Sequence, residues 1–204
     1  MDSTNNPKSC VVLYSGGMDS TVVLHHALAN YSKVYALAFD YGQRNIRELS
    51  GAENYITNYI NKSSFADKLK YSCMPLPLKF LNFNSALTRD DIEVPKMKEV
   101  IGDPQNMAYV PNRNMIFLSL AIGMAESVEA SDVLYGAAKA DDTSGFWDCT
   151  PDFRNLLNNI ISLNRRNLIQ IKTPLIDKTK KEIIEYGLEL GVEFAWTRTC
   201  YTEH

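Results

Sequence analysis

The first part of the chain alternates short apolar runs with a helix-like segment, and this alternation restricts the fold more than any other feature. Residues 10–14 are apolar, rich in β-branched side chains and followed by Ser-Gly-Gly, which is typical of a buried strand. Residues 19–30 carry apolar side chains at helical spacing. Residues 34–39 are almost uninterrupted apolar, as in strands covered on both faces. The pattern predicts a parallel α/β sheet with right-handed crossovers.

The rest of the chain continues the alternation. A second helix is predicted from apolar residues three or four apart, namely Ile46, Leu49, Ala52, Ile56 and Tyr59. Later elements are predicted as a helix over 114–129, a strand over 132–137, a helix from residue 151 and a strand over 169–173. Thr150 and Pro151 form a good helix start, and Asp177 is predicted to cap a last helix that ends at Gly191.

The middle of the chain is different in character. Five of the eight prolines fall between Pro75 and Pro111. Two short strands are predicted near 69–74 and 79–83, followed by an irregular stretch over 84–110. A proline-rich loop of this length is typical of a lid or substrate-binding loop, or of a partly disordered segment.

Length and composition exclude several classes of protein. The 204 residues can bury a full core, and we expect one doubly wound α/β domain over 1–204 with a short tail at 192–204. No apolar run approaches the roughly 20 residues of a membrane span, and the N-terminus lacks the pattern of a secretory signal. The 21 basic residues against 24 acidic ones give no excess for nucleic acid. Four scattered cysteines without a C-x-x-C pair favour free thiols, so we expect a cytoplasmic protein.

The loop after the first predicted strand is the strongest candidate site. Residues 15–20 read Ser-Gly-Gly-Met-Asp-Ser and lie where open parallel sheets bind ligands. The glycines allow a tight turn, and the N-terminus of the following helix offers free N–H groups to an anion. The Gly-Lys-Ser/Thr ending of a Walker loop is absent. On spacing alone, a simple turn with Asp19 capping the helix stays an alternative.

The six-residue string resembles the S-G-G-x-D-S signature of the PP-loop ATP pyrophosphatases, which cleave ATP between the α and β phosphorus. Further strings narrow the resemblance, and they are FDYGQR at 39–44, LTRD at 87–90, VPNRN at 110–114, GFWDC at 145–149 and TPLIDKTKKEI at 173–183. In this order they are similar to the 7-cyano-7-deazaguanine synthases of the queuosine pathway. The resemblance covers residues 10–201 and implies an adenine-nucleotide α-hydrolase type of Rossmann-like fold.

The resemblance implies an ATP-dependent carbon–nitrogen ligase. Such enzymes adenylate the carboxylate of 7-carboxy-7-deazaguanine, let ammonia displace AMP to give an amide, and remove the amide oxygen, formally as water, in a second activation. Adenylation turns a poor electrophile into one with a good leaving group, and a cationic site then stabilises charge on the phosphate oxygens. The implied cofactors are ATP and Mg²⁺, with Zn²⁺ doubtful, and the implied assembly is a homodimer.

The resemblance also implies roles for individual residues. Catalytic roles fall to Asp19, Arg113 and Lys180. The ATP site comprises Leu13, Tyr14, Ser15, Gly16, Gly17, Met18, Asp19, Ser20, Thr21, Phe39, Asp40 and Tyr41. The substrate site comprises Gln43, Arg44, Arg89, Arg113, Asn114, Asp141, Asp142, Phe146 and Asp148.

Two of these cations conflict with local helix electrostatics. Arg113 and Lys180 fall at helix starts, where a cation opposes the macrodipole. Such conflicts are expected at functional sites, because a bound anion reverses their sign. Solvated side chains at a small cost are the alternative, and this applies equally to Lys181.

Other candidates have structural alternatives. Asp141 and Asp142 would bind a metal or a base edge, or simply open a turn. Phe146 and Trp147 would stack on a planar base or pack in the core. Cys149 is expected to be a small buried residue. On the first helix, His25 is predicted to be exposed and His26 packed, neither with a catalytic role.

The C-terminus departs from the resembled family. There, a string like Thr199-Cys200-Tyr201 is followed by three more cysteines that complete a zinc site. This sequence ends at His204, and Cys200 alone cannot supply the four ligands of structural zinc. A shortened chain, a natural form without zinc and ligands from another chain all stay open.

Three other functions stay open at this point. A divergent relative would stop at the amide or transfer the activated acyl group to another amine. A tRNA-modifying PP-loop enzyme is disfavoured by the acidic balance. A non-catalytic nucleotide-binding regulator would not need an intact pyrophosphate loop.

Overall fold

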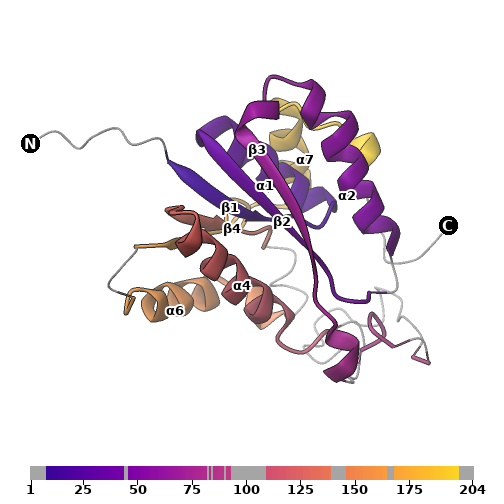
Figure 1. Ribbon diagram of the computed structural model, residues 1–204, viewed down its shortest axis with the longest axis vertical. Helices are drawn as coiled ribbons and strands as arrows, with labels where there is room; N and C mark the ends of the chain where they lie inside the picture. The colour runs from indigo at the N-terminus through magenta and orange to yellow at the C-terminus, as the bar shows by residue number, and fades with distance from the viewer. Residues whose placement is uncertain are drawn as a thin grey trace, which may run out of the picture.

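A parallel sheet of five strands forms the centre of the computed structural model (Figure 1), with strand order β3-β2-β1-β4-β5. The strands are β1 (Ser9–Leu13), β2 (Lys33–Asp40), β3 (Leu69–Pro75), β4 (Asp132–Leu134) and β5 (Gln170–Lys172). The structure describes residues 8–43, 46–81, 83, 85–89, 91–92, 109–138, 146–164 and 168–197. The predicted doubly wound parallel α/β sheet is confirmed.

Helices cover both faces of the sheet (Figure 1). On one face lie α1 (Met18–Asn30), α2 (Ile46–Asn58) and α7 (Lys180–Glu189), and on the other lie α4 (Arg113–Ser127) and α6 (Pro151–Ile161). Single 3₁₀ turns lie at Ile60–Lys62, Ala66–Lys68, Leu78–Leu81, Trp147–Cys149 and Phe194–Trp196. Each face has its own apolar cluster, so the sheet is buried between two helical layers.

The order in which the chain adds strands to the sheet reverses at β1, and this reversal determines where a ligand can bind. β1 pairs with β2 on one side, where Val11 lies opposite Tyr35, and with β4 on the other, where Val11 lies opposite Val133. The chain passes from β1 to β2 and β3, then returns to β4 and β5. The connections that follow β1 and β4 therefore start side by side at the carboxyl edge of the sheet, which is where open α/β sheets bind their ligands.

β2 shows why the apolar pattern produces this sheet. Residues 34–39 are all buried, because helices cover both faces of the strand. Each fully buried Val, Leu or Phe side chain contributes roughly 1.5–3 kcal/mol to folding. Asp40 ends the run at the carboxyl edge and is exposed.

Some predicted elements are wrong or shorter. The strand predicted over 79–83 is replaced by the 3₁₀ turn at Leu78–Leu81, where Phe80 is almost fully exposed. No described strand lies beyond β3 on that side of the sheet, so this segment has nothing to pair with. β4 ends at Leu134 rather than Ala137, because the chain then turns towards the start of α1.

The prediction that His25 of the first helix is exposed is wrong. His25 is buried, with 2% of its surface exposed, and its Nε2 lies 2.7 Å from the Tyr55 hydroxyl. His26 is half-buried and its Nδ1 lies 2.6 Å from the Tyr186 hydroxyl. His25 packs towards α2 and His26 towards α7, and only His25 is fully buried.

Two helix caps were predicted, one correctly. The Thr150 hydroxyl accepts a hydrogen bond from the Phe153 N–H at the start of α6, as predicted. The last helix is capped by Thr179 rather than Asp177, in a reciprocal capping box with Glu182. Its end near Gly191 is confirmed, since Gly191 has a φ of 76°.

Candidate active site

The loop between β1 and α1 is closed by its own two serines. The Ser20 hydroxyl donates to the Gly17 carbonyl at 2.9 Å and accepts from the Ser15 N–H at 3.2 Å. Because the single Ser20 proton is used in this way, the Ser15 hydroxyl is the donor in the 3.1 Å contact between the two side chains. Gly16 has a φ of 83°, which favours glycine. The hydroxyls of Ser15 and Ser20, two residues of the predicted ATP site, therefore shape the loop in this structure.

The start of α1 differs from the starts of the other capped helices. The first N–H groups of a helix have no intrahelical partner. Side chains satisfy these groups at α6 and α7, but at α1 the N-cap residue is Gly17, with no side-chain cap. Within the described part of the chain, no side chain caps the first N–H groups of α1, the element that follows β1 at the carboxyl edge of the sheet. These N–H groups are suited to bind an anion.

Lys180 lies directly over this helix start. Its Nζ donates to Asp19 Oδ2 at 2.6 Å, although 161 positions separate the two residues. The amine is about half exposed and the carboxylate about one quarter exposed, so the pair is accessible to a ligand. Among the described residues, the second oxygen, Asp19 Oδ1, is buried without a hydrogen-bond partner. The structure thus brings together two of the three predicted catalytic residues.

Gly136, which sequence reasoning missed, forms the other wall of the loop. A Cβ at this position would lie 3.3 Å from the Asp19 carbonyl carbon and 3.3 Å from the Ser20 nitrogen. Glycine therefore lets the segment after β4 pack against the first turn of α1. Its place inside the strand predicted over 132–137 was the signal that could have identified it, because a glycine within a strand often marks the close approach of another backbone.

The end of β2 is held by Gln43. Its buried side chain accepts from the Tyr41 N–H at 3.0 Å and donates to the Phe39 carbonyl at 3.5 Å. The Phe39 ring stacks on Phe117 of α4 at 4.4 Å between centroids. Asp40 stays exposed and accepts from the Gly42 N–H. Gln43 therefore holds the turn in this structure, and Asp40 faces solvent at the carboxyl edge.

Four of the predicted substrate residues, Arg113, Asn114, Phe146 and Asp148, lie at or near the start of α4. Arg113 is half-buried, and its Nη1 donates to the Tyr41 hydroxyl at 3.4 Å. The Asn114 amide donates to Cys149 Sγ at 3.6 Å, and Cys149 is buried as predicted. The nearby Phe146 ring stacks on Tyr109 at 6.4 Å. Strings far apart in the sequence thus meet on the α4 side of the carboxyl edge.

Asp148 is a buried carboxyl group in this cluster. Burial raises its pKa, while the Arg113 guanidinium and N–H donation from the backbone of Asp148 and Asn114 act in the opposite direction. The Tyr135 hydroxyl donates to the Asp148 carbonyl at 3.2 Å, which fixes the residue above the end of β4. Asp148 therefore offers a buried carboxyl group next to Arg113 at this edge of the sheet.

Other predicted residues are not brought into this cluster. Arg89 is exposed and pairs with Asp91, and each group shifts the pKa of the other, upward for Arg89 and downward for Asp91. Arg44, Asp141, Asp142 and Cys200 lie outside the described residues. Within the described ranges, no three His, Cys, Asp or Glu residues are grouped to hold a metal. The zinc expectation stays a prediction.

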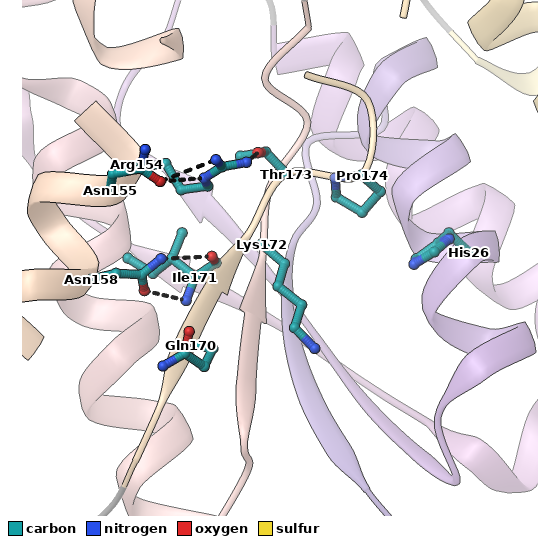
Figure 2. Close-up of a pocket in the computed structure, with 9 residues that line it drawn as sticks. All are labelled: His26, Arg154, Asn155, Asn158, Gln170, Ile171, Lys172, Thr173 and Pro174. Carbon is teal, nitrogen blue, oxygen red and sulfur yellow. Dashed lines mark hydrogen bonds between the residues drawn. The ribbon is translucent and has the colours of Figure 1, made fainter. Parts of the chain in front are cut away.

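A separate groove of about 500 Å³ lies along the β5 edge of the sheet (Figure 2). It is lined by His26, Arg154, Asn155, Asn158, Gln170, Ile171, Lys172, Thr173 and Pro174, none of them a predicted site residue. The Asn158 amide donates to the Ile171 carbonyl at 3.1 Å and accepts from its N–H at 2.8 Å. One side chain thus does for the edge what a neighbouring strand would do.

Comparison with known proteins agrees with this architecture. The family described as "Queuosine biosynthesis protein QueC" matches residues 9–204. The chain belongs to the QueC family. The 7-cyano-7-deazaguanine synthase of Alteromonas mediterranea is 39% identical over 200 residues, covering 95% of this chain and 84% of its own. The synthase of Thermoplasma acidophilum is also 39% identical, over 95% of this chain and 79% of its own. The predicted family is confirmed.

Solved structures support the fold of this QueC-family chain. The U34-tRNA thiolase NcsA from Methanococcus maripaludis aligns with a TM-score of 0.54 at 15% identity, over 98% of this chain and 61% of its own. The NH3-dependent NAD synthetase from Campylobacter jejuni gives 0.51 at 15% identity, over 95% and 68%. At these identities the likeness concerns the fold alone, and it agrees with the predicted doubly wound α/β fold. No helix in the described ranges is long and apolar enough to cross a membrane.

Proposed function

We propose that this protein is a 7-cyano-7-deazaguanine synthase that binds the pyrophosphate part of ATP at the β1–α1 loop. The observation that carries the proposal is the Asp19–Lys180 pair, which lies over the uncapped start of α1. The QueC-family relatives, which carry this name at about 40% identity, support the assignment. ATP use follows from the family.

The loop would act on the leaving pyrophosphate. In the proposed reaction a carboxylate oxygen of 7-carboxy-7-deazaguanine attacks the α-phosphorus, and the bond to the bridging oxygen of pyrophosphate breaks. Negative charge then develops on pyrophosphate, where N–H groups at the start of α1 and the Lys180 ammonium would stabilise it. Binding would require Lys180 to exchange Asp19 for phosphate oxygens.

The α4 side of the carboxyl edge would hold the substrate. Arg113 offers a guanidinium for the carboxylate or for the α-phosphate, and Asp148 offers a buried acceptor for the base. Ammonia would then attack the adenylated carbonyl carbon, and AMP would leave to give the amide. A second ATP would activate the amide oxygen, and loss of AMP and a proton would give the nitrile.

The residues present fit Mg²⁺ at one position. Asp19 Oδ1 is a buried carboxylate oxygen without a partner among the described residues, and hard cations prefer such ligands. When bound there, Mg²⁺ would neutralise charge on the β and γ phosphates. Asp19 would hold the ion next to the loop through Oδ1, while Lys180 moves from Oδ2 to the phosphate oxygens.

The decisive experiment measures products. The protein is incubated with Mg-ATP, ammonia and 7-carboxy-7-deazaguanine, and pyrophosphate release and product mass are followed. Nitrile formation is expected, whereas amide alone would support the divergent relative. Absence of substrate-dependent pyrophosphate would contradict both.

A homodimer in the cytoplasm is proposed from the family resemblance. Exposed apolar side chains of α6, Leu156 and Ile160, offer a surface that a second copy could cover. Light scattering should give twice the monomer mass of 23.0 kDa. A monomer at micromolar concentration would contradict this part of the proposal.

A further inference from the structure

Gly187 lies in the middle of α7, where glycine is the least favourable residue apart from proline. The residue is buried against α1. A Cβ built at this position would lie 2.9 Å from Val22 Cγ2 of α1 and would collide with the Phe194 ring. A packing requirement therefore explains the glycine.

Helices α1 and α7 contact each other at several points, and these contacts follow the same order along both helices. Asp19 contacts Lys180 at 2.6 Å, and Val22 faces Gly187 one turn further along α1. Beyond them, His25 Nδ1 lies 3.1 Å from the Leu190 carbonyl. The helices thus run in the same direction, with both N-termini at the carboxyl edge of the sheet, and Gly187 lies at a contact too close for a Cβ.

We propose that Gly187 is a positioning residue, which sets the spacing of α7 against α1 and thereby holds Lys180 over the β1–α1 loop. The inference rests on the proposed function of that loop. Carbon atoms in contact prefer separations of about 3.5–4.0 Å, so a methyl group at this position would push the helices apart by roughly 0.6–1 Å. Val22 is fully buried, and its β-branched side chain strongly prefers one rotamer in a helix, so it yields little space to a methyl group.

The displacement would reach Lys180 because a helix moves as a rigid body over two turns. Lys180 precedes Gly187 by seven residues, about 10 Å along the axis. Thr179 and Glu182 fix the first turn of α7 by the capping box, so the turn moves together with the helix. Misplacement of a charged group by about 1 Å can lower a rate by up to about a hundredfold.

The test uses Gly187→Ala, with Gly123→Ala as the matched control. Gly123 is also helical, but a Cβ there would meet nothing within 4 Å. We expect kcat/KM for ATP to fall by roughly tenfold or more in Gly187→Ala and to stay at the wild-type value in Gly123→Ala. Wild-type kcat/KM in Gly187→Ala would overturn the proposal.

Coupling to Lys180 separates positioning from general damage to the fold. If Gly187 acts through Lys180, Lys180→Met should cost much less in the Gly187→Ala background than in the wild type. An equal loss in both backgrounds would overturn the proposal. The same double-mutant comparison of Lys180→Met and Gly187→Ala can be made without turnover by measuring the equilibrium binding of Mg-ATP by calorimetry. Lack of any substrate-dependent pyrophosphate in the wild type would instead defeat the proposed function.

A relief variant covers the case in which Gly187→Ala does not fold. Val22→Ala and Phe194→Ala remove the atoms that the new methyl group would meet, so the triple variant should regain the fold and the full effect of Lys180→Met. The double variant without Gly187→Ala is its control. A triple variant that folds, while its Lys180→Met effect stays small, would contradict the spacing argument.

Discussion

Single residues decide whether the β1–α1 loop can bind phosphate. Among the residues that the structure describes, Lys180 is the cation paired with Asp19, and we expect it to stabilise charge on the leaving pyrophosphate. Lys180→Met should therefore lower kcat/KM for ATP, measured by pyrophosphate release, by about 10²-fold or more. Lys181, which is exposed and lies 3.6 Å from Glu185, provides the control. A Lys181→Met variant that loses as much activity would contradict the assignment.

Gly136 provides a second prediction at this scale. Gly136→Ala would place a methyl group 3.3 Å from backbone atoms of Asp19 and Ser20, which must then move by a few tenths of an ångström. We expect KM for ATP to rise by roughly tenfold, with KM for 7-carboxy-7-deazaguanine unchanged. Steady-state kinetics with each substrate varied in turn measures both. Equal changes in the two constants would argue against a local effect on the loop.

The sequence identified the loop but not its surroundings. The string at residues 15–20 and the charge conflict at Lys180 were sufficient to nominate both. Their contact joins residues 161 positions apart, and no local pattern contains that information. The two glycines were missed for the same reason, since their value depends on which backbone or side chain lies opposite.

At the scale of helices and strands, one buried side chain connects several elements. The His25 ring joins α1 to α2 and to the end of α7. Because the Leu190 carbonyl can only accept, Nδ1 carries the proton and Nε2 accepts from the Tyr55 hydroxyl. Burial lowers the pKa of His25 below its usual value. The folded state therefore favours the neutral ring.

A pH dependence of stability follows from this shift. The stabilising contribution of neutral His25 is complete above the unfolded pKa of about 6.5 and is lost as the pH falls towards the lower folded pKa. The free energy of unfolding should thus decrease below pH 6.5, and less steeply in His25→Gln. Burial also lowers the pKa of His26, so part of the slope should stay. Urea unfolding between pH 5 and 8 measures it, and an unchanged slope in His25→Gln would contradict the argument.

Elements were predictable where one pattern dominated. The long apolar run of β2 and the spacing in α2 gave correct assignments, since burial and periodicity agreed. The cap of α7 was misplaced, although Thr179 followed by Glu182 three residues later is a capping-box pattern and Asp177 has no such partner in the sequence. The strand predicted over 79–83 is wrong because a strand needs a neighbouring strand to pair with, and a local sequence pattern does not reveal whether one is present.

At the scale of the whole molecule, ligand binding should stabilise the fold. Mg-ATP at about 100 times its Kd adds about 2.7 kcal/mol, which corresponds to an increase in Tm of roughly 5–10 °C for a domain of this size. The increase should disappear in Asp19→Asn, because that change removes the proposed metal ligand. An equal increase in the variant would place the nucleotide elsewhere. Differential scanning calorimetry provides both values.

The central claim is that the carboxylate of 7-carboxy-7-deazaguanine attacks the α-phosphorus of ATP. The most direct test labels both carboxylate oxygens with ¹⁸O and analyses the AMP by mass spectrometry. Adenylation followed by attack of ammonia must leave one labelled oxygen on AMP, and the second activation must transfer the labelled amide oxygen to another AMP. We predict labelled AMP throughout nitrile formation. Unlabelled AMP, or release of ADP and phosphate instead of pyrophosphate, would contradict the account.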